Sequence, residues 1–415
     1  MTSFSLLAWI VLGVALQSAL YLGIAFWRHW RTYRTLCDET AALDLPAAPA
    51  APARGEESAG AAWPGFRTFK VARKVLEDEA NTVCSFHLVP EDGQPLPPFL
   101  PGQYLSFRLT LPTATGSDEQ TVRCYSLSDA PCPDHYRVSI KRVPLGRASN
   151  HFHDRVAVGK LLQVRAPAGH FYLDRGDAPV VLIAGGIGIT PLLSMLNWCV
   201  AAQPEREVWL FYGVRDGREL ALKAHLESLA AAHPQFHLRR CFSQPRPEDV
   251  AGRDYEQRGR IDVERLRLQL PLKPYRFYLC GPTPMLEALV PALEDWGVPE
   301  SRIHFEAFGP ASIKRRHATA SPSAAAPAAA SDIVVTFGRS GKQVPWSVGA
   351  GSLLELAEAH GIAIDSGCRA GGCGCCQTTI RAGEVSYRQA PDYDPEPGTC
   401  LLCSCVPKTS VTLEA

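Results

Sequence analysis

Seven of the fourteen cysteines of this 415-residue chain lie in its last 48 residues. Four of them follow the spacing C-x4-C-x2-C with a fourth cysteine 27 positions further on: Cys368, Cys373, Cys376 and Cys403. This is the spacing of a plant-type [2Fe–2S] site, which takes three thiolates from one tight loop and the fourth from a distant segment. Glycines at positions 371, 372 and 374 allow the loop backbone to turn closely around inorganic sulfides.

Other uses of these cysteines fit the spacing less well. Structural zinc would more naturally use two C-x2-C pairs, and disulfides require an oxidising compartment. The loop resembles that of the plant-type ferredoxin family, C-R-x-G-x-C-G-x-C, at every fixed position. Cys400 and Cys405 compete with Cys403 for the fourth ligand, and the resemblance favours Cys403, which follows two apolar residues as the last ligand of the family usually does. The remaining cysteines of this region, including Cys375, are interpreted as small packed thiols.

Two further motifs contain residues suited to holding a flavin. The first is Arg123-Cys-Tyr125-Ser126, and the second runs from Gly146 through Ser149 and Asn150. An arginine can pair with a phosphate in bidentate fashion, a tyrosine can lie on a flavin ring, and a serine hydroxyl can reach the ring atom N5. Gly146 and Ser149 can open a helix whose free N–H groups accept a pyrophosphate. Taken alone, R-x-Y-S is also consistent with an ordinary strand end.

Together with Pro101-Gly-Gln-Tyr104, these motifs resemble the flavin domain of the ferredoxin–NADP reductase superfamily. The resemblance implies that Tyr125 stacks on the flavin and that Ser126 bonds N5. It also implies that four residues of the two motifs hold the flavin phosphates: Arg123, Gly146, Ser149 and Asn150. On the strand between the motifs, it implies two further contacts, Ser139 and Lys141. The S-N-x-x-H run looks more like FAD-binding members of the superfamily than FMN-binding ones.

A glycine-rich run, Gly185-Gly186-Ile-Gly188-Ile-Thr190-Pro191, follows an apolar strand. Thr190 can cap the next helix and Pro191 suits its first position. The glycines allow a pyrophosphate to lie against the helix N-terminus. The run departs from G-x-G-x-x-G, and in isolation it would indicate only a tight turn, but its form resembles the nicotinamide-nucleotide motif of the same superfamily.

That resemblance extends to later residues of the same region. It implies ribose contacts at Arg215, a nicotinamide facing Cys280, Gly281 and Pro282, and a hydride-transfer point near Glu306 and Phe308. A buried strand end for Cys280 and a plain core position for Phe308 are the alternatives. NADPH requires a cation for its 2′-phosphate; Arg215 and Arg246 are available, but Asp216 and Glu248 lie beside them. The sequence therefore favours NADH over NADPH.

The elements that position these residues fall into three folded units. Residues 64–175 show short period-2 apolar runs broken by Pro and Gly, which predict an antiparallel β-barrel FAD domain. Strand and helix patterns alternate over 177–310, which predicts a parallel-sheet, α/β NAD(P)-binding domain. Residues 332–415 are expected to form an α+β, ferredoxin-like (β-grasp) domain. The formal net charge is zero, so nothing in the composition favours nucleic acid as a partner.

The segment Phe4–Trp27 contains no charged residue and, as a helix, would span about 36 Å, more than a hydrocarbon core of about 30 Å. Arg28, Arg31 and Arg34 follow it at once. The sequence therefore predicts a transmembrane helix at 4–27, with the folded units on the cytoplasmic side of the inner membrane. A cleaved signal peptide would want its basic residues before the apolar run. Ala- and Pro-rich linkers are expected at 36–63 and 311–331.

The assembled motifs predict an NAD(P)H-dependent reductase with FAD, a [2Fe–2S] cluster and NADH as cofactors. Flavin can link a two-electron hydride donor to a one-electron cluster. The layout resembles the single-chain reductases of Rieske-type oxygenases and of hybrid-cluster protein. The resemblance implies an acceptor protein such as an oxygenase, a desaturase or a hybrid-cluster protein, expected here to be membrane-bound. The alternatives are the NADH-oxidising subunit of a sodium-pumping quinone reductase, in which the ferredoxin domain comes first, and a redox sensor without turnover.

Overall fold

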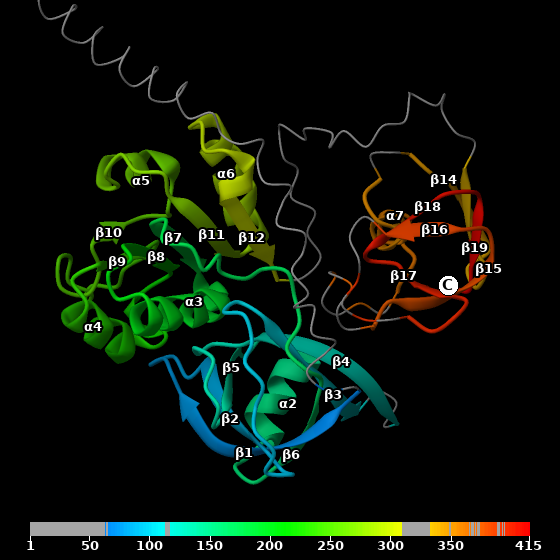
Figure 1. Cartoon of the computed structure of the whole chain (residues 1–415), viewed down its shortest axis with the longest axis horizontal. Coiled ribbons are helices and arrows are strands. Elements are labelled where there is room, and N and C mark those ends of the chain that lie inside the picture. The colour runs from blue at the N-terminus through cyan, green and yellow to red at the C-terminus, as the bar shows by residue number, and fades with distance from the viewer. Residues whose placement is uncertain are drawn as a thin grey trace, which may run out of the picture. The chain divides into compact units, whose positions relative to one another are not determined.

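The structure is a computed structural model. It describes residues 63, 65–112, 117–308, 333–347, 350–364, 374–387 and 395–415, together with the single positions 366, 369, 371, 391 and 393. The predicted linker 311–331 and all of the linker 36–63 except Trp63 lie outside these residues. Three successive units follow along the described chain, coloured blue to cyan, green to yellow and orange to red in Figure 1.

The predicted fold class is corrected with respect to the membrane. Within the described ranges, no helix combines the length and the apolar character needed to cross a bilayer. The predicted span Phe4–Trp27 lies outside the described residues. The prediction of a single-pass protein in the inner membrane therefore has no support, and we withdraw it.

The first unit is a six-stranded antiparallel sheet in the order β4-β3-β6-β1-β2-β5. Alternate residues of its strands enter one core, which includes Phe69, Phe86 and Phe107, and the helix α2 adds Phe152 to it. The elements are β1 (Arg67–Leu76), β2 (Val83–Pro90), β3 (Tyr104–Pro112), β4 (Asp118–Ser126), β5 (Tyr136–Lys141), α2 (Arg147–Arg155) and β6 (Leu161–Val164).

The predicted antiparallel β-barrel is a half-barrel. The edge strands β4 and β5 meet through an isolated bridge, Leu127 to Val138, rather than through a ladder. Pro131 and Pro133 lie in the segment that joins these strands. Because proline has no N–H to donate, this segment is a poor continuation of a sheet, and the chain leaves the sheet soon after Ser126.

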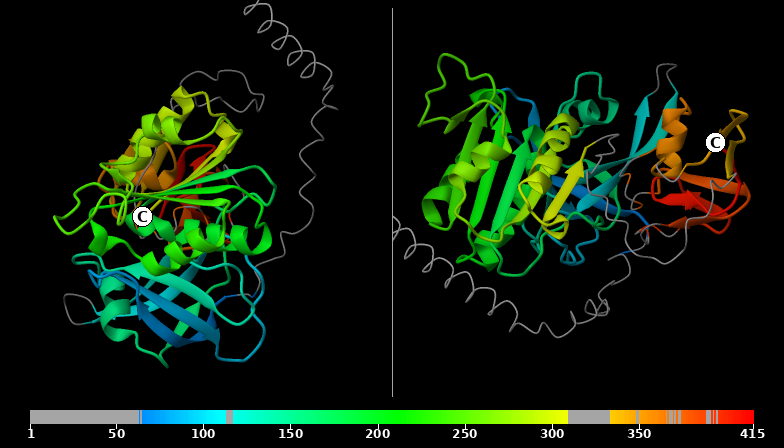
Figure 2. Two further views of the ribbon diagram at one scale, coloured as in Figure 1. Left: turned by 90° about the vertical axis from the view of Figure 1, so that its left-hand side faces the viewer. Right: turned by 90° about the horizontal axis from the view of Figure 1, so that it is seen from above.

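The second unit is a six-stranded parallel sheet in the order β10-β9-β8-β7-β11-β12, seen with its strands side by side in Figure 2. Its elements are β7 (Val180–Gly185), η1 (Gly186–Gly188), α3 (Ile189–Ala202), β8 (Val208–Val214), η2 (Gly217–Glu219), α4 (Lys223–Ala232), β9 (Phe236–Phe242), β10 (Gln257–Arg258), α5 (Val263–Gln269), β11 (Arg276–Gly281), α6 (Thr283–Asp295), η3 (Glu300–Arg302) and β12 (Ile303–Ala307). The predicted alternation of strands and helices thus appears in the structure.

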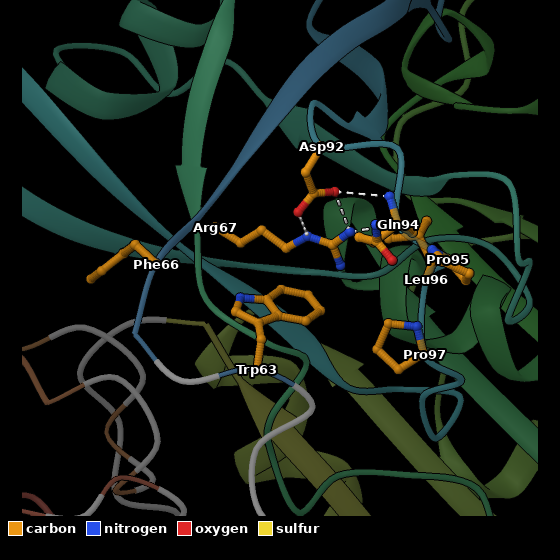
Figure 3. A pocket seen from close by; sticks show the side chains of 8 residues that line it. All are labelled: Trp63, Phe66, Arg67, Asp92, Gln94, Pro95, Leu96 and Pro97. Atoms are coloured by element: carbon orange, nitrogen blue, oxygen red, sulfur yellow. Dashed lines mark hydrogen bonds and ion pairs between the residues drawn. The ribbon is translucent and has the colours of Figure 1, made fainter.

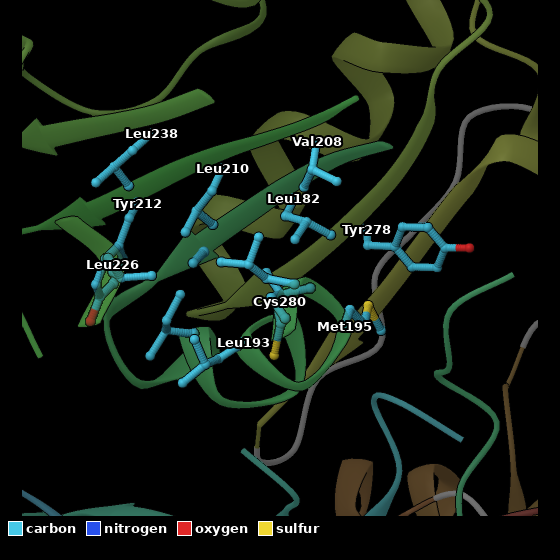
Figure 4. Packing of buried hydrophobic residues seen from close by; sticks show 14 of the residues in the cluster. Leu182, Leu193, Met195, Val208, Leu210, Tyr212, Leu226, Leu238, Tyr278 and Cys280 are labelled. Carbon is cyan, nitrogen blue, oxygen red and sulfur yellow. The ribbon is translucent and has the colours of Figure 1, made fainter. Parts of the chain in front are cut away.

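Helices cover both faces of this sheet, which explains why the sequences of its strands are continuous apolar runs. On β7, Leu182 packs with residues of α3 and α4, whereas Val181 and Ile183 pack with residues of α5 and α6. Figure 4 shows the first of these cores, in which Leu193 and Leu226 reach the sheet from their helices. The carboxyl ends of the parallel strands meet at one edge, and the glycine-rich turn lies there.

The third unit has a five-stranded mixed sheet in the order β14-β13-β19-β15-β17 and a two-stranded sheet of β16 and β18. Ser352 caps its helix through a reciprocal pair of bonds with Glu355, the arrangement called a capping box. The elements are β13 (Val334–Phe337), β14 (Lys342–Pro345), α7 (Leu353–Ala359), β15 (Gln377–Ala382), β16 (Val385–Tyr387), β17 (Thr399–Leu401), β18 (Cys405–Pro407) and β19 (Val411–Leu413). This is the expected α+β arrangement.

Candidate functional site

The end of β4 carries the first flavin motif. Tyr125 packs its ring against the edges of Phe107 and Phe152, at centroid distances of 5.8 and 5.1 Å. Ser126, the next residue, is buried. The exposed Arg123 donates from Nη1 to the Thr121 hydroxyl at 2.6 Å and to the Val122 carbonyl. The strand therefore presents the three predicted side chains in sequence, with the tyrosine ring held by aromatic packing.

The second flavin motif opens α2, as predicted. Gly146 is the N-cap residue of this helix. The Ser149 hydroxyl accepts from the Val143 N–H at 3.2 Å and donates to the Gly146 carbonyl. A Cβ atom at Gly146 would lie 2.6 Å from the Ser149 Oγ, so only glycine leaves this turn uncrowded. Asn150, one position on, accepts from Arg142 at 3.5 Å. The nine-residue helix and its close-packed start fit a bound pyrophosphate.

Two predicted flavin contacts are engaged elsewhere. The hydroxyl of Ser139 is buried between the hydroxyls of Ser85 and Ser128, at 2.6 and 2.8 Å. Lys141 pairs with Glu219 at 3.2 Å. Ser139 thus belongs to a hydrogen-bonded serine trio inside the sheet, and Lys141 is held by a carboxylate of the nucleotide unit.

The glycine-rich turn after β7 is packed without room for side chains. A Cβ at Gly188 would lie 2.1 Å from the Cys280 carbonyl oxygen, and one at Gly185 would lie 2.7 Å from Pro282. A Cβ at Gly281 would approach the Gly185 backbone to 3.0 Å. The turn therefore lies directly on the end of β11, where close approach of backbone to a pyrophosphate and a nicotinamide is possible.

The start of the helix α3 differs from the prediction. A 3-10 turn, Gly186–Gly188, precedes the helix, which begins at Ile189 with Gly188 as its N-cap residue. Thr190 is therefore the second helical residue, and its hydroxyl donates to the Ile187 carbonyl at 3.0 Å. Pro191 is the third residue. Both lie in the first turn, where the missing proline N–H is tolerated.

The strand end of β11 places Cys280 beside Glu306 of the neighbouring strand β12. Cys280 is fully buried in the core shown in Figure 4. Burial, and secondarily the charge of Glu306, raise the pKa of its thiol well above the usual value. The group is therefore a neutral thiol at physiological pH and not a nucleophile. Phe308, just beyond β12, is 41% exposed rather than a core residue.

The end of β8 carries the residues that bear on the choice of nucleotide. Arg215 is largely exposed and pairs with Glu219 at 3.5 Å. Asp216 is buried and accepts from the Arg218 N–H, which caps η2. Arg246 approaches Asp216 at 3.8 Å and Asp249 at 3.4 Å. The guanidinium groups near this edge thus already face carboxylates.

The described part of the cluster loop brings two predicted ligands together. The backbone N–H of Cys403 donates to the Cys376 sulfur at 3.4 Å, and the Leu402 N–H donates to the Cys376 carbonyl. Cys368 and Cys373 lie outside the described residues. Gly374 has φ of 73°, and a Cβ there would lie 2.8 Å from the Tyr393 ring. A thiolate that accepts a backbone N–H, within a loop turned at glycine, fits a [2Fe–2S] cluster.

The rival ligands occupy a different environment. Cys400 and Cys405 are fully buried in the core of the third unit, on the strands β17 and β18. Cys403 lies on the turn between those strands and is only partly buried. The two strands therefore carry packed thiols, and the turn carries Cys403, whose backbone N–H reaches the Cys376 sulfur.

Two cavities are formed by other surfaces. One, of about 580 Å³, is shown in Figure 3. Trp63, Arg67 and the proline-rich segment Gln94–Pro97 line it, and Arg67 is held there by the Asp92 carboxylate at 2.6 Å. The second, of about 690 Å³, lies between α7 and β15 and includes Cys375 in its wall. The flavin motifs contribute to neither of these walls.

The sequence did not predict a role for three residues at the junction of the first two units. Asp129 follows the R-x-Y-S motif, and Ser194 and Asn197 lie on α3; hydrogen bonds connect them. The only sequence signal was a pair of polar residues spaced i, i+3 within an otherwise apolar helix. Such a pair can equally mark a solvent-facing side, so its meaning depended on the tertiary structure.

Three family models match the chain in succession. They are an oxidoreductase FAD-binding domain over residues 78–172, an oxidoreductase NAD-binding domain over 182–290 and a 2Fe-2S iron-sulfur cluster binding domain over 335–408. The order of the three matches agrees with the order of the three folded units. The predicted cofactors FAD, NAD and [2Fe–2S] are confirmed at this level.

Similar proteins cover different parts of the chain. A flavohemoprotein of Halalkalibacterium halodurans is 39% identical over 256 residues, which are 60% of this chain and 61% of the relative. The chain thus spans about three fifths of the length of the curated relatives that it matches.

Solved structures extend the comparison. The FAD/NAD-binding domain of nitric oxide dioxygenase from Vibrio cholerae is 33% identical, with a TM-score of 0.53, and this chain covers 100% of it. Phthalate dioxygenase reductase is 27% identical with a TM-score of 0.51, over 85% of this chain and 98% of that one.

These matches define the class of protein. The chain belongs to the ferredoxin–NADP reductase family and carries a C-terminal [2Fe–2S] domain. It is an NAD(P)H-dependent flavin and iron–sulfur oxidoreductase, which confirms the predicted enzyme class.

Proposed function

We propose that the chain transfers electrons from NADH, through FAD and the [2Fe–2S] cluster, to an acceptor protein such as an oxygenase, a desaturase or a hybrid-cluster protein. The observation that carries the proposal is the similarity to phthalate dioxygenase reductase, which extends over 85% of this chain. That reductase has a modular structure for electron transfer from pyridine nucleotides to [2Fe-2S]. Domain bounds of 64–175, 177–310 and 332–415 remain part of the proposal.

The flavin would be held at β4 and α2. When bound, flavin accepts a hydride and releases electrons one at a time, and the cluster carries single electrons. In the proposal, Tyr125 lies against the ring and the Ser126 hydroxyl donates to N5. Arg123 pairs with a phosphate. The first turn of α2 binds the pyrophosphate: Gly146 leaves the start of the helix uncrowded, the Ser149 N–H belongs to the first turn, whose N–H groups have no partner within the helix, and the Asn150 side chain lies beside it.

The nicotinamide nucleotide would be held at the edge of the parallel sheet. The turn Gly185–Gly188 and the first residues of α3 receive the pyrophosphate, and Arg215 lies near the ribose. Gly281, buried at the end of β11, and the exposed Pro282 face the nicotinamide, while Cys280 supports them from the core. Glu306 and Phe308 border it on the next strand. Arg246 already faces two carboxylates, which supports NADH over NADPH.

The cluster would take its ligands from Cys368, Cys373, Cys376 and Cys403. Cys376 and Cys403 are in contact through a backbone N–H donated to sulfur. Hydrogen bonds to the sulfur ligands are one of the means by which a protein sets the potential of such a cluster.

Anaerobic titration with NADH tests the proposal. We expect the flavin absorbance to bleach first and the electron paramagnetic resonance signal of the reduced cluster to follow. The variant Cys376→Ser should keep flavin reduction and ferricyanide turnover but lose NADH-driven reduction of cytochrome c. Cytochrome c reduction that survives in this variant would contradict the proposed route. Turnover of a water-soluble quinone in preference to protein acceptors would favour a quinone reductase, and absence of turnover with every acceptor would favour a sensor.

A further inference from the structure

Asp129 connects the flavin sheet to the first helix of the nucleotide unit. Its backbone carbonyl accepts from the Ser194 hydroxyl at 2.6 Å, and its carboxylate Oδ1 accepts from the Asn197 side-chain amide at 2.7 Å. Ser194 and Asn197 are separated by three positions and therefore lie on the same side of α3. Asp129 thus receives two hydrogen bonds from one helix face.

These contacts are buried and well supported. Ser194 is fully buried, and Asn197 is 8% exposed. On the flavin side, the other carboxylate oxygen of Asp129 pairs with the buried Arg137 at 3.3 Å, and Arg137 in turn donates to the Ser128 carbonyl. On the nucleotide side, the Asn197 oxygen is bonded to His225 of α4 at 2.9 Å. A buried polar network whose members are paired holds its elements in one arrangement.

The network lies between the two proposed cofactor sites along the chain. Asp129 is three residues after Ser126, and the intervening backbone is fixed because Leu127 donates to the Gln103 carbonyl and Ser128 to the Arg137 carbonyl. Ser194 is five residues into α3, about 7 Å along the helix axis from its start at the glycine-rich turn. A rigid helix and a short fixed backbone segment therefore join the two sites.

Other hydrogen bonds join residues 64–175 to the nucleotide unit in two places. One lies near η2 and α4, where Ala80 donates to the Arg218 carbonyl, Leu222 donates to the Glu77 carbonyl, and Lys141 pairs with Glu219. The other lies at residues 174–175, where the Asp174 N–H donates to the Tyr278 hydroxyl, Arg206 donates to the Asp174 carbonyl and Gln203 donates to the Arg175 carbonyl. Of these contacts, only that of Gln203 involves α3, and it lies at the end of the helix opposite the glycine-rich turn. Asp129 contacts α3 closer to the glycine-rich turn, at Ser194 and Asn197.

We propose that Asp129 is a positioning residue for hydride transfer: by holding Ser194 and Asn197, it sets the position of α3, and hence of the turn Gly185–Gly188, relative to Ser126. The inference rests on the proposed roles of Ser126 and the glycine-rich turn. Hydride transfer requires the donor carbon close to the acceptor nitrogen, and a displacement of about 1 Å can slow a reaction about 100-fold. A contact that fixes this distance therefore affects the rate more than the binding of either cofactor.

The test compares variants of α3 in the full chain. The double variant Ser194→Ala/Asn197→Ala removes both donors and leaves the Asp129–Arg137 pair intact. We expect its anaerobic flavin reduction at saturating NADH to slow about 10- to 100-fold. The FAD and iron contents and the apparent affinity for NADH should change little. The long-wavelength charge-transfer absorbance of the NADH–flavin pair should weaken, since it depends on stacking geometry.

A control and a second variant make the result decisive. Gln203→Ala removes a contact to the Arg175 carbonyl at the carboxyl end of α3, the end opposite the glycine-rich turn, and should leave flavin reduction unchanged. Asn197→Asp keeps the side-chain volume but places a second carboxylate against Asp129, so it should slow reduction even if the double variant folds poorly. Normal reduction rates in properly folded variants, with only a lower melting temperature, would overturn the inference. Failure of NADH to reduce the flavin of the unmodified protein would instead overturn the proposed function.

Discussion

The nucleotide unit and the ferredoxin unit use glycine and cysteine for opposite purposes. At the end of β7, Gly188 is required because a Cβ would collide with the Cys280 carbonyl. In the cluster loop, Gly374 is required chiefly because the chain turns there with φ of 73°. Cys280 is a buried core thiol, whereas Cys403 is a partly buried thiol on a turn. The same residue types therefore serve close packing in one unit and metal binding in the other.

The largest expected effect comes from adding a side-chain carbon at Gly188, in the glycine-rich turn. Gly188→Ala places a Cβ 2.1 Å from backbone oxygen, which cannot move without shifting β11. We expect the free energy of unfolding of the nucleotide unit to fall by about 3 kcal/mol or more, since overpacking a rigid site costs that much at its upper end. Urea denaturation followed by tryptophan fluorescence measures this.

Gly213→Ala is the matched control, because its Cβ would first meet the end of the Ile261 side chain at 3.2 Å. A small loss of stability in Gly213→Ala, together with a large loss in Gly188→Ala, would support close backbone packing as the role of Gly188. Equal losses at both positions would mean that the close backbone contact at Gly188 has no special effect.

Replacing one proposed cluster ligand tests the role of cysteine in the ferredoxin unit. Cys403→Ser should abolish the [2Fe–2S] cluster, measured as iron and acid-labile sulfide per chain, while FAD content stays unchanged. Cys400→Ala should keep the cluster and lower only the stability of the third unit, because Cys400 is fully buried in its core. Retention of a full cluster in Cys403→Ser, with loss in Cys400→Ala, would show that the fourth ligand was assigned to the wrong residue.

The glycine and cysteine motifs show which features of the molecule could be predicted from the sequence. The C-x4-C-x2-C spacing and the G-G-I-G-I-T-P run indicated their cofactors directly, because each depends on a few neighbouring residues. The capping role predicted for Thr190 was wrong, since the 3-10 turn at Gly186–Gly188 delays the helix and makes Gly188 its cap. The packing of Gly188 on Cys280 joins residues almost a hundred positions apart, and no local pattern reveals it.

Strands were predicted where one face of the strand is apolar. β4 lacks this pattern because most of its residues are polar and partly exposed, and its pairing with β3 is what makes it a strand. In the third unit, β15 and β16 are likewise partly exposed, whereas β17 and β18 have buried residues but are only three residues long, too short to show an alternating pattern. The β-barrel was predicted from strand content alone, which does not reveal that the edge strands β4 and β5 meet only through an isolated bridge. The roles of individual flavin and nucleotide contacts stay predictions.

The thiols of the nucleotide unit should also affect stability at alkaline pH. Burial raises the pKa of Cys199 to about 11 from the ordinary value of 9.0. Because the folded thiol ionises later than the unfolded one, its contribution to stability is present below pH 9 and is lost as the pH rises to about 11. Two pKa units correspond to roughly 2 to 3 kcal/mol.

Chemical denaturation between pH 8 and 11 measures this loss, with Cys199→Ala as the comparison. The variant should be less stable at pH 8 because it loses packed volume, but its stability should fall less steeply toward pH 11. Parallel pH profiles for the two proteins would mean that the Cys199 thiol is not responsible for the alkaline slope. The comparison therefore distinguishes a cysteine that only packs, such as Cys199, from one that is proposed to bind iron, such as Cys403.

The smallest expected effect distinguishes two buried serines of the flavin sheet. Ser126→Ala removes the hydroxyl proposed to donate to the flavin, and a single neutral hydrogen bond is worth about 0.5–1.5 kcal/mol. Flavin reduction by NADH should therefore slow roughly 2- to 10-fold, with FAD retained. Ser139→Ala is the matched control, because its hydroxyl already bonds Ser85 and Ser128. It should lower stability and leave the reduction rate unchanged, as measured by stopped-flow absorbance. A slower rate in Ser139→Ala alone would instead place the functional hydroxyl on β5.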